Sequence, residues 1–379
     1  LLEGTSFAAA GHVISLSADF SGTVTDPAAI PGATTGNTGG DIGDISFVPN
    51  IYTAMPLGER WHIGIGINVP FGLKTQYDEN WDGRFQGVKS EVTSLNINPS
   101  VSYKVSDTVA IGAGINYQRL DAELTQAVVL APPVTAGVEE GRYALEADDD
   151  GWGWNIGVMF QLSPATRLGI AYRSEIDYTL EGNLDVTNSA GVLVPLVSGA
   201  SQGDVTLPDM LSLSAAFQAS DRLQLLADIT RTGWGSVDQI AVVDPGTGGV
   251  RDILVLEFDD ALRYSIGGNY VLSDLWTLKG GLAFDETPVK NAETRIVRLP
   301  DNDRTWISFG VQRKVGQSGR TVGQLDFAYT HIFIKDAPIN HTKSQRDATG
   351  APIPGTATTV TGTYEGSVDI FSIQYSVAF

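Results

Sequence analysis

Hydrophobic and polar residues alternate one by one along most of this chain. The clearest run is RLGIAYRSEIDYTLEGNLDV, residues 167–186, in which even positions are mainly apolar and odd positions mainly charged or small. A period of two sustained over such a run predicts a β-strand and excludes a helix. At about 3.3 Å per residue this strand would be roughly 66 Å long, far longer than strands of soluble sheets. We therefore expect one continuous strand that crosses a thick layer and projects beyond it.

The same alternation closes the chain. In DIFSIQYSVAF, residues 369–379, one face of the predicted strand carries Phe371, Ile373, Tyr375, Val377 and Phe379. An amphipathic last strand that ends on an aromatic residue is typical of bacterial outer-membrane barrels, and it predicts recognition by the barrel assembly machinery. Taken alone, the segment would also suit the last strand of a soluble sandwich.

Short turn motifs recur along the chain, and longer loop-like segments lie between them. The turns are at 57–60, 105–108, 163–166, 219–222, 272–275 and 315–319, and stretches rich in Gly, Thr, Pro and Asp include 24–42, 127–146, 187–203 and 336–362. Six short turns and two free ends define about seven strand–loop–strand hairpins, hence about fourteen strands. Short periplasmic turns and long extracellular loops are the asymmetry of a transmembrane β-barrel. The expected fold class is therefore all-β, with residues 1–379 forming a single antiparallel barrel domain.

Composition agrees with a sheet that has one apolar and one polar face. The chain of 379 residues has 43 Gly, no Cys, 42% hydrophobic and 18% charged residues. No run approaches the length of apolar sequence that a transmembrane helix needs. The net charge of −20 argues against nucleic acid, whose phosphates need Lys and Arg. Aromatic residues that suit interfacial girdles, or are plain strand formers, are Trp61, Tyr103, Tyr172, Trp276 and Tyr375.

One amphipathic run is interrupted by residues unsuited to a sheet. Ile63, Ile65 and Ile67 alternate with small or polar residues, and the run then meets Pro70 and Gly72. Proline has no N–H for a ladder, and glycine weakens a strand interior. We expect the pairing to kink or break over residues 68–72, although a simple strand end is the alternative.

Several segments together resemble the FadL family of outer-membrane transporters for long-chain fatty acids and other hydrophobic compounds. They are NVPFGLKTQYDENWDGRF (68–85), LNINPSVSYKV (95–105), GWGWNIGVMFQL (151–162), AYRSEIDYTLEGN (171–183), LPDM (207–210), AFDETPV (283–289), RIVRLPDNDRTWISFG (295–310) and the terminal YSVAF. The resemblance implies a fourteen-stranded barrel, which the turn count predicts independently, and an outer-membrane monomer. It also implies an N-terminal hatch in the lumen, which we expect to be absent from this chain, whose first residues are LLEGTSFAAAGHV.

The resemblance also implies roles for particular residues. The family's kinked third strand, a lateral opening through which an apolar ligand leaves into the outer leaflet, is matched by Asn68, Val69, Pro70, Phe71 and Gly72. A loop whose apolar groove captures hydrophobic ligand from outside is matched by Leu73, Tyr77, Trp81, Phe85 and Val88. The spacing of Trp81, Phe85 and Val88 would place them on one face of a short helix. Ordinary packing is the alternative for such an aromatic stripe.

The positions that meet a carboxylate in the family carry other residues in this chain. The family's two basic residues that meet a fatty-acid carboxylate correspond here to Gln126 and Leu254. Possible headgroup contacts are instead Arg84, Lys89, Arg119 and Arg251, although lumen cations commonly pair with neighbouring acids. This departure leaves room for neutral aliphatic or aromatic hydrocarbons as ligands.

Catalytic and metal-binding patterns are lacking in the sequence. The histidines are scattered without metal-ligand spacing, and there is no nucleophile elbow or P-loop. The run 148–150, DDD, would suit a divalent cation that bridges lipopolysaccharide, or a solvated strand end. We therefore expect no enzyme, no metal and no cofactor.

The leading functional interpretation is passive transport of hydrophobic molecules, long-chain fatty acids above all, across the outer membrane. The expected partners are such a ligand, outer-membrane lipid with lipopolysaccharide, and the assembly machinery. A hydrocarbon channel, an outer-membrane barrel enzyme, a general porin and a soluble β-sandwich binding protein are the alternatives.

Overall fold

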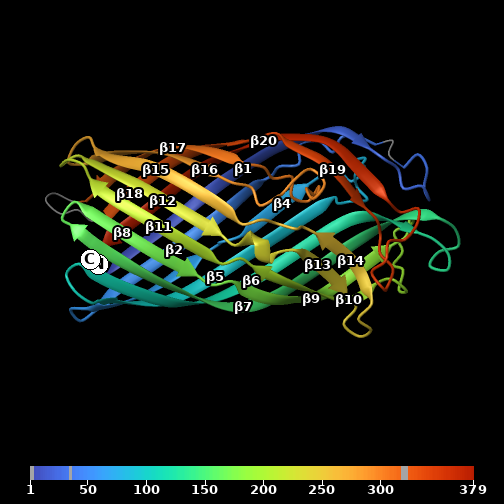
Figure 1. Cartoon of the computed structure of the whole chain (residues 1–379), viewed down its shortest axis with the longest axis horizontal. Helices are drawn as coiled ribbons and strands as arrows, with labels where there is room; N and C mark the ends of the chain where they lie inside the picture. The colour runs from blue at the N-terminus through green and yellow to red at the C-terminus, as the bar shows by residue number, and fades with distance from the viewer. Residues whose placement is uncertain (1–3, 34–35, 317–322) are drawn as a thin grey trace.

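In the part of the chain that the structure describes, the strands form one closed antiparallel barrel (Figure 1). Its wall consists there of 14 strands. The computed structural model describes residues 4–33, 36–316 and 323–379. The barrel closes where β1 (Ser6–Val24) pairs with β20 (Thr358–Ala378), from Ser6 opposite Ala378 to Val24 opposite Val360. Pairing of the first strand with the last means that neither end of the sheet is left as an open edge. The predicted fold class and strand number are confirmed.

Eight of the wall strands are continuous and six are divided into two segments. The continuous strands are β1, β2 (Ile45–Leu57), β5 (Lys89–Lys104), β6 (Val109–Leu130), β7 (Glu139–Ser163), β16 (Trp276–Asp285), β17 (Arg304–Val315) and β20. The divided strands are β3 (Trp61–Asn68) with β4 (Gly72–Gln76), β8 (Thr166–Arg173) with β9 (Ile176–Thr187), β10 (Gly199–Leu207) with β11 (Met210–Gln218), β12 (Leu223–Thr232) with β13 (Gln239–Val243), β14 (Val250–Val255) with β15 (Ala261–Val271), and β18 (Gly323–Ile334) with β19 (Ala337–Lys343).

The predicted turns and loops are largely where the sequence places them. The turns at 57–60, 105–108, 163–166, 219–222 and 272–275 each join two paired strands, whereas 315–319 extends outside the described residues. The expected loop at 127–146 is wrong, because β6 and β7 continue as a hairpin and leave only 131–138 between them. The termini lie at the turn end of the barrel (Figure 1).

Large apolar side chains face outward on the half of the barrel nearest the turns. This lipid-facing belt includes Phe47, Ile63, Val101, Ile111, Ile156, Ile170, Leu213, Ile266, Leu282, Phe309, Phe333 and Phe371. Aromatic pairs flank it, because the rings of Trp61 and Tyr103 lie 4.5 Å apart near a turn and those of Tyr117 and Trp152 lie 5.0 Å apart on the loop side. Such girdles mark the two membrane interfaces.

On the loop side of the belt, the outward side chains of the wall become polar and the inward side chains become apolar. On β6 the outward residues change from Ile111 and Ile115 to Arg119 and Asp121. The inward side chains there become apolar, as at Leu120. The outer half of the barrel is therefore polar outside and apolar inside, which suits a wall that stands in water above the bilayer.

The expected continuous strand over 167–186 is wrong. The ladder breaks between β8 and β9 at Ser174 and Glu175, where the Ser174 hydroxyl accepts a bond from the Trp154 N–H at 2.9 Å. Before the break Ile170 faces outward, and after it Ile176 is buried inside. The alternation continues in sequence, but the apolar face must turn from lipid to lumen where the strand leaves the bilayer.

Helical structure is minimal in the part of the chain that the structure describes. It consists of the short 3-10 turn η1 (Trp234–Ser236), and no described helix is long and apolar enough to span a membrane. A short helix over 81–88, which the spacing would suit, is not formed: residues 82–86 are turns, and Trp81 forms an isolated bridge with Asn37.

Candidate ligand path through the barrel wall

The third wall strand breaks at the predicted place. β3 ends at Asn68, paired with Asn96, and β4 resumes at Gly72, paired with Thr93. Three residues, Val69 to Phe71, thus lie opposite two, Ser94 and Leu95, so the segment must bulge. The Ser94 hydroxyl holds the bulge, because it donates to the Phe71 carbonyl at 2.6 Å and accepts from the Phe71 N–H at 3.0 Å.

The break leaves part of the wall without a backbone ladder. β2 pairs with β1 from residue 45 to 54, but its pairing with β3 stops at Ile51. Among the described ladders, β4 pairs with β5 and none joins it to residues 45–50 of β2. The loop side of this wall gap is crossed by an ion pair between Lys74 Nζ and Asp44 Oδ2 at 2.7 Å. Pairing is thus missing between residues 45–50 and the bulge.

An apolar lumen wall lies directly inside the break. Phe71 packs with a buried cluster of Leu120, Ile176, Tyr178 and Leu207. Its ring also meets that of Trp234 edge to face, with centroids 5.7 Å apart. The bulge therefore turns Phe71 into the lumen, where the ring contacts apolar residues from strands across the barrel.

The five residues expected to capture ligand do not form one exposed groove in this structure. Tyr77, Trp81 and Val88 pack inside the outer half of the lumen against residues such as Phe20 and Tyr364. The ring of Trp81 stacks on that of Tyr77 with centroids 3.9 Å apart. Phe85 belongs to a separate buried cluster with Ala127 and Val129, and Leu73 is half-buried. Their role in capture stays a prediction.

Each cation expected to contact a headgroup is paired with acidic side chains. The pairs are Arg84 with Glu140, Lys89 with Glu91 and Glu123, Arg119 with Asp121, Asp148 and Asp150, and Arg251 with Asp244. Arg84 also donates to the carbonyl oxygens of Trp81 and Ala33, at 3.1 and 2.7 Å. These contacts stabilise loops, and headgroup binding by the four residues stays a prediction.

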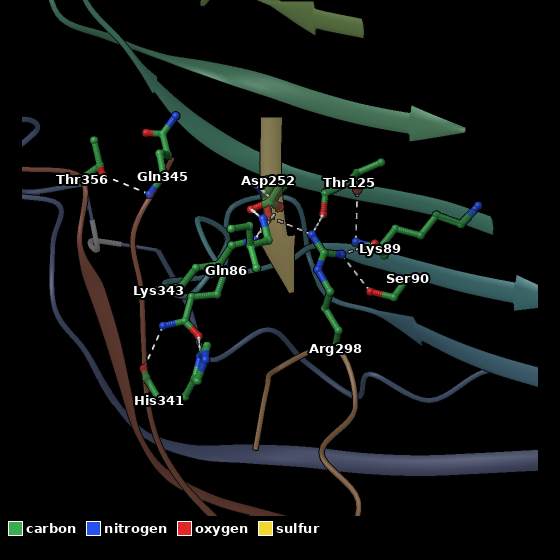
Figure 2. Close-up of polar contacts among 12 residues, drawn as sticks. Gln86, Lys89, Ser90, Thr125, Asp252, Arg298, His341, Lys343, Gln345 and Thr356 are labelled. Atoms are coloured by element: carbon green, nitrogen blue, oxygen red, sulfur yellow. Dashed lines mark hydrogen bonds and ion pairs between the residues drawn. The ribbon is translucent and has the colours of Figure 1, made fainter. Parts of the chain in front are cut away.

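Figure 2 shows a network of polar side chains, most of them buried, in the outer half of the lumen. Gln126 Oε1 accepts bonds from Arg298 Nη2 at 2.9 Å and from Lys343 Nζ at 2.7 Å. Lys343 also pairs with Asp252 at 2.8 Å, and burial lowers the pKa of the lysine although Asp252 opposes this. Positive charge thus reaches Gln126 from residues far along the chain. From the sequence, Gln126 and Lys89 are expected at positions near a headgroup, but nothing in the sequence shows that Arg298 and Lys343 would turn inward to meet Gln126.

The turn-side half of the lumen encloses a cavity of about 1710 Å³. Small inward residues such as Gly64, Gly112 and Gly157 line it. At the end nearest the strand break its lining includes Asn68, Asn96, Asn116, Asn155 and Arg173. The lumen therefore changes from an amide-lined chamber to an apolar wall at the level of the break.

No cluster of three or more His or acidic side chains suited to a metal ion occurs in residues 4–33, 36–316 and 323–379. His331 Nδ1 instead lies 2.7 Å from Asp369 Oδ1, and His12 bonds to Ser372 and Asn50. The interior thus contains an apolar wall beside an amide-lined chamber, and a separate polar network around Gln126.

A lipid-facing belt, aromatic girdles and loops that fold into the lumen define a bacterial outer-membrane β-barrel of the transporter class. The family described as "Outer membrane protein transport protein (OMPP1/FadL/TodX)" matches residues 1–379, and the chain belongs to this family of outer-membrane transporters of hydrophobic compounds. Members of the family are transporters, not enzymes.

Sequence relatives agree with this assignment. Outer membrane protein P1 of Haemophilus influenzae is 26% identical over 361 residues, which cover 88% of this chain and 75% of that protein. The long-chain fatty acid transport protein of Escherichia coli K12 is 27% identical over 308 residues, which cover 71% of this chain and 68% of that protein.

Solved structures share the fold. A Pseudomonas aeruginosa FadL homologue superposes with a TM-score of 0.88 at 23% identity, covering 100% of this chain and 91% of the other. The Ralstonia pickettii toluene transporter TbuX superposes with a TM-score of 0.69 at 20% identity, covering 100% of this chain and 90% of the other. At these identities the likeness concerns the fold alone.

Proposed function

We propose that this protein carries long-chain fatty acids passively across the outer membrane, and that they leave through the wall gap at Asn68, Val69, Pro70, Phe71 and Gly72. The observation that carries the proposal is the missing ladder between β4 and residues 45–50 of β2, next to an apolar lumen wall. An apolar molecule at Phe71 would pass sideways into lipid without entering the amide-lined chamber.

The passage needs no energy source. Transfer of an alkyl chain from water to lipid is favourable by about 0.8 kcal/mol per CH₂ group, so partition alone drives uptake. The protein supplies a route past the lipopolysaccharide layer. In this scheme Leu73, Tyr77, Trp81, Phe85 and Val88 become the capture surface when segment 73–88 moves outward.

Uptake of neutral aliphatic or aromatic hydrocarbons is a second candidate. It is favoured by the acidic partners of Arg84, Lys89, Arg119 and Arg251, because these pairs leave the four cations without a free charge for a carboxylate. The two candidates share the wall gap and differ in the headgroup.

Uptake of labelled oleate and of labelled hexadecane into cells tests both candidates. The key variant is Pro70→Thr combined with Gly72→Val, which restores a donor and strand-forming side chains; a Cβ at Gly72 would meet no atom closer than the Val92 carbonyl oxygen at 3.7 Å. Pro195→Thr, in the exposed loop between β9 and β10, is the matched control.

We expect both ligands to enter through the wild type and the control, and much less of either through the double variant. Unchanged uptake by a correctly folded double variant would refute the lateral route. Failure of both ligands to enter through the wild type would refute the transport function, and entry of hexadecane alone would favour the hydrocarbon channel.

A further inference from the structure

The lumen changes from polar to apolar at one level on β5, on β6 and on the divided strand β8–β9. On β5 the change runs from Asn96 to Val92, and on β6 it runs from Gln118 to Leu120. Asn96 pairs with Gln118 across these strands, so the two changes lie side by side. On β8 and β9, which pair with the far side of β7, it runs from Arg173, at the end of β8, to Ile176, at the start of β9. Of the three residues on the polar side of this boundary, Asn96, Gln118 and Arg173, the arginine alone is charged.

Arg173 is a half-buried cation that touches neutral oxygens. Its Nη2 donates to Gln118 Oε1 at 2.6 Å and to Asn96 Oδ1 at 3.3 Å. Within the described residues no carboxylate lies within 4.0 Å of it, and no hydrogen bond uses its Nε or Nη1. The side chain lines the large cavity. Donors of the guanidinium are thus available to a molecule in the chamber.

The amides around Arg173 lead to the wall gap. Asn96 Nδ2 donates to Asn68 Oδ1 at 2.9 Å, and Asn68 is the last residue of β3 before the break. A second group joins Asn98, Asn116 and Asn155 through bonds of 2.7 to 3.2 Å. Amide groups carry no net charge, so they leave the positive charge of Arg173 uncompensated.

Two other lumen cations, Arg298 and Lys279, have more of their donors occupied than Arg173 has. Arg298 is enclosed by oxygen acceptors, namely Lys89 O, Ser90 Oγ, Thr125 O and Gln126 Oε1. Lys279 pairs with Asp326 at 2.7 Å. A guanidinium removed from bulk water is stabilised by an anion, and its fork of N–H groups matches the two oxygens of a carboxylate.

We propose that Arg173 binds the carboxylate of an amphiphile whose alkyl chain lies against Phe71, Leu120 and Tyr178 at the inner mouth of the wall gap. The inference rests on the proposed transport function and assigns the ligand an anionic headgroup. The headgroup site is separate from Gln126 and Leu254, and it lies on the other side of the apolar cluster from the loops. The arrangement holds the polar end at the chamber while the chain faces the exit.

Equilibrium binding of labelled oleate and labelled oleyl alcohol to the protein in lipid nanodiscs tests the site. The two probes share the chain and differ in headgroup charge. The variants are Arg173→Gln, which removes the charge, and Arg173→Lys, which keeps it without the fork. The control is Arg167→Gln, which removes a cation from the turn end of the same strand and cavity.

We expect Arg173→Gln to weaken oleate binding by about ten-fold or more and to leave oleyl alcohol nearly unchanged. Arg173→Lys should fall between wild type and Arg173→Gln, and Arg167→Gln should bind both probes as the wild type does. Equal losses for both probes, or no loss for oleate in a folded Arg173→Gln protein, would overturn the site while leaving transport intact. A wild type that binds neither probe would overturn the transport function and the site together.

Discussion

At the scale of single residues, buried polar side chains decide which loops stay inside the outer half of the lumen. Gln86 Nε2 donates to the carbonyl oxygens of His341 and Thr358, each at 2.9 Å, and so ties segment 73–88 to β19 and β20. His341 Nδ1 lies 2.8 Å from Gln86 Oε1. These partners are more than 250 residues apart in sequence, so no local pattern could have predicted the contact.

His341 should make the attachment of segment 73–88 to β19 and β20 sensitive to pH. Burial, helped by the neighbouring Lys343 charge, lowers the pKa of His341 to about 4 from a usual value of 6.5. Between these two values the open or unfolded protein binds the proton and the closed protein does not. Neutral His341 therefore makes its full contribution to the free energy of unfolding above pH 6.5. This contribution is lost as the pH falls toward 4, and the loss is at most about 3 kcal/mol.

The measurement is proteolysis of segment 73–88 at increasing urea concentrations, at pH 7 and at pH 4.5. The urea concentration at which half of the protein is cleaved reports the stability of the segment. The wild type should lose far more stability between these values than His341→Asn, which keeps a donor near the Nδ1 position but does not titrate. Equal pH dependence of the two proteins would show that another group is responsible.

At the scale of elements, the sequence predicts strands and turns well and the orientation of their faces less well. Period-two alternation identified β8, β9 and β20, and short Ser/Asp/Gly turns identified the connections. The same alternation cannot show that the environment outside a strand changes from lipid to water. That change is why Ile170 faces out, Ile176 faces in, and the ladder must break at Ser174.

Because the outer face of β8 meets lipid and that of β9 meets water, introducing an arginine should destabilise the protein on β8 and have little effect on β9. Ile170→Arg places a cation on the lipid-facing belt and should cost about 2–4 kcal/mol of unfolding free energy. Thr179→Arg, on the exposed outer face of β9, should change stability by less than about 0.5 kcal/mol. Urea unfolding of the barrels in lipid vesicles gives both values. Similar costs at both positions would mean that Thr179 also lies in the bilayer.

At the scale of the whole molecule, the barrel, its membrane placement and the break at Pro70 follow from pattern and turn chemistry. The contents of the lumen do not, because loops fill it with residues distant in sequence. Trp81 contacts Phe20, and Arg298 reaches Lys89 and Ser90. An aromatic stripe such as Tyr77 and Trp81 has the same sequence whether it meets ligand or packs against its own barrel.

Photo-crosslinking with a long-chain fatty acid that carries a diazirine at its chain end would follow the ligand path most directly. The protein in nanodiscs would be labelled, digested and mapped by mass spectrometry. Lateral exit predicts adducts at Phe71 and on the apolar wall formed by Leu120 and Tyr178, with few at Ala110 and Met159 deep in the chamber. Adducts concentrated at Ala110 and Met159, and unchanged in the Pro70→Thr/Gly72→Val variant, would contradict lateral exit and indicate a route straight through the lumen.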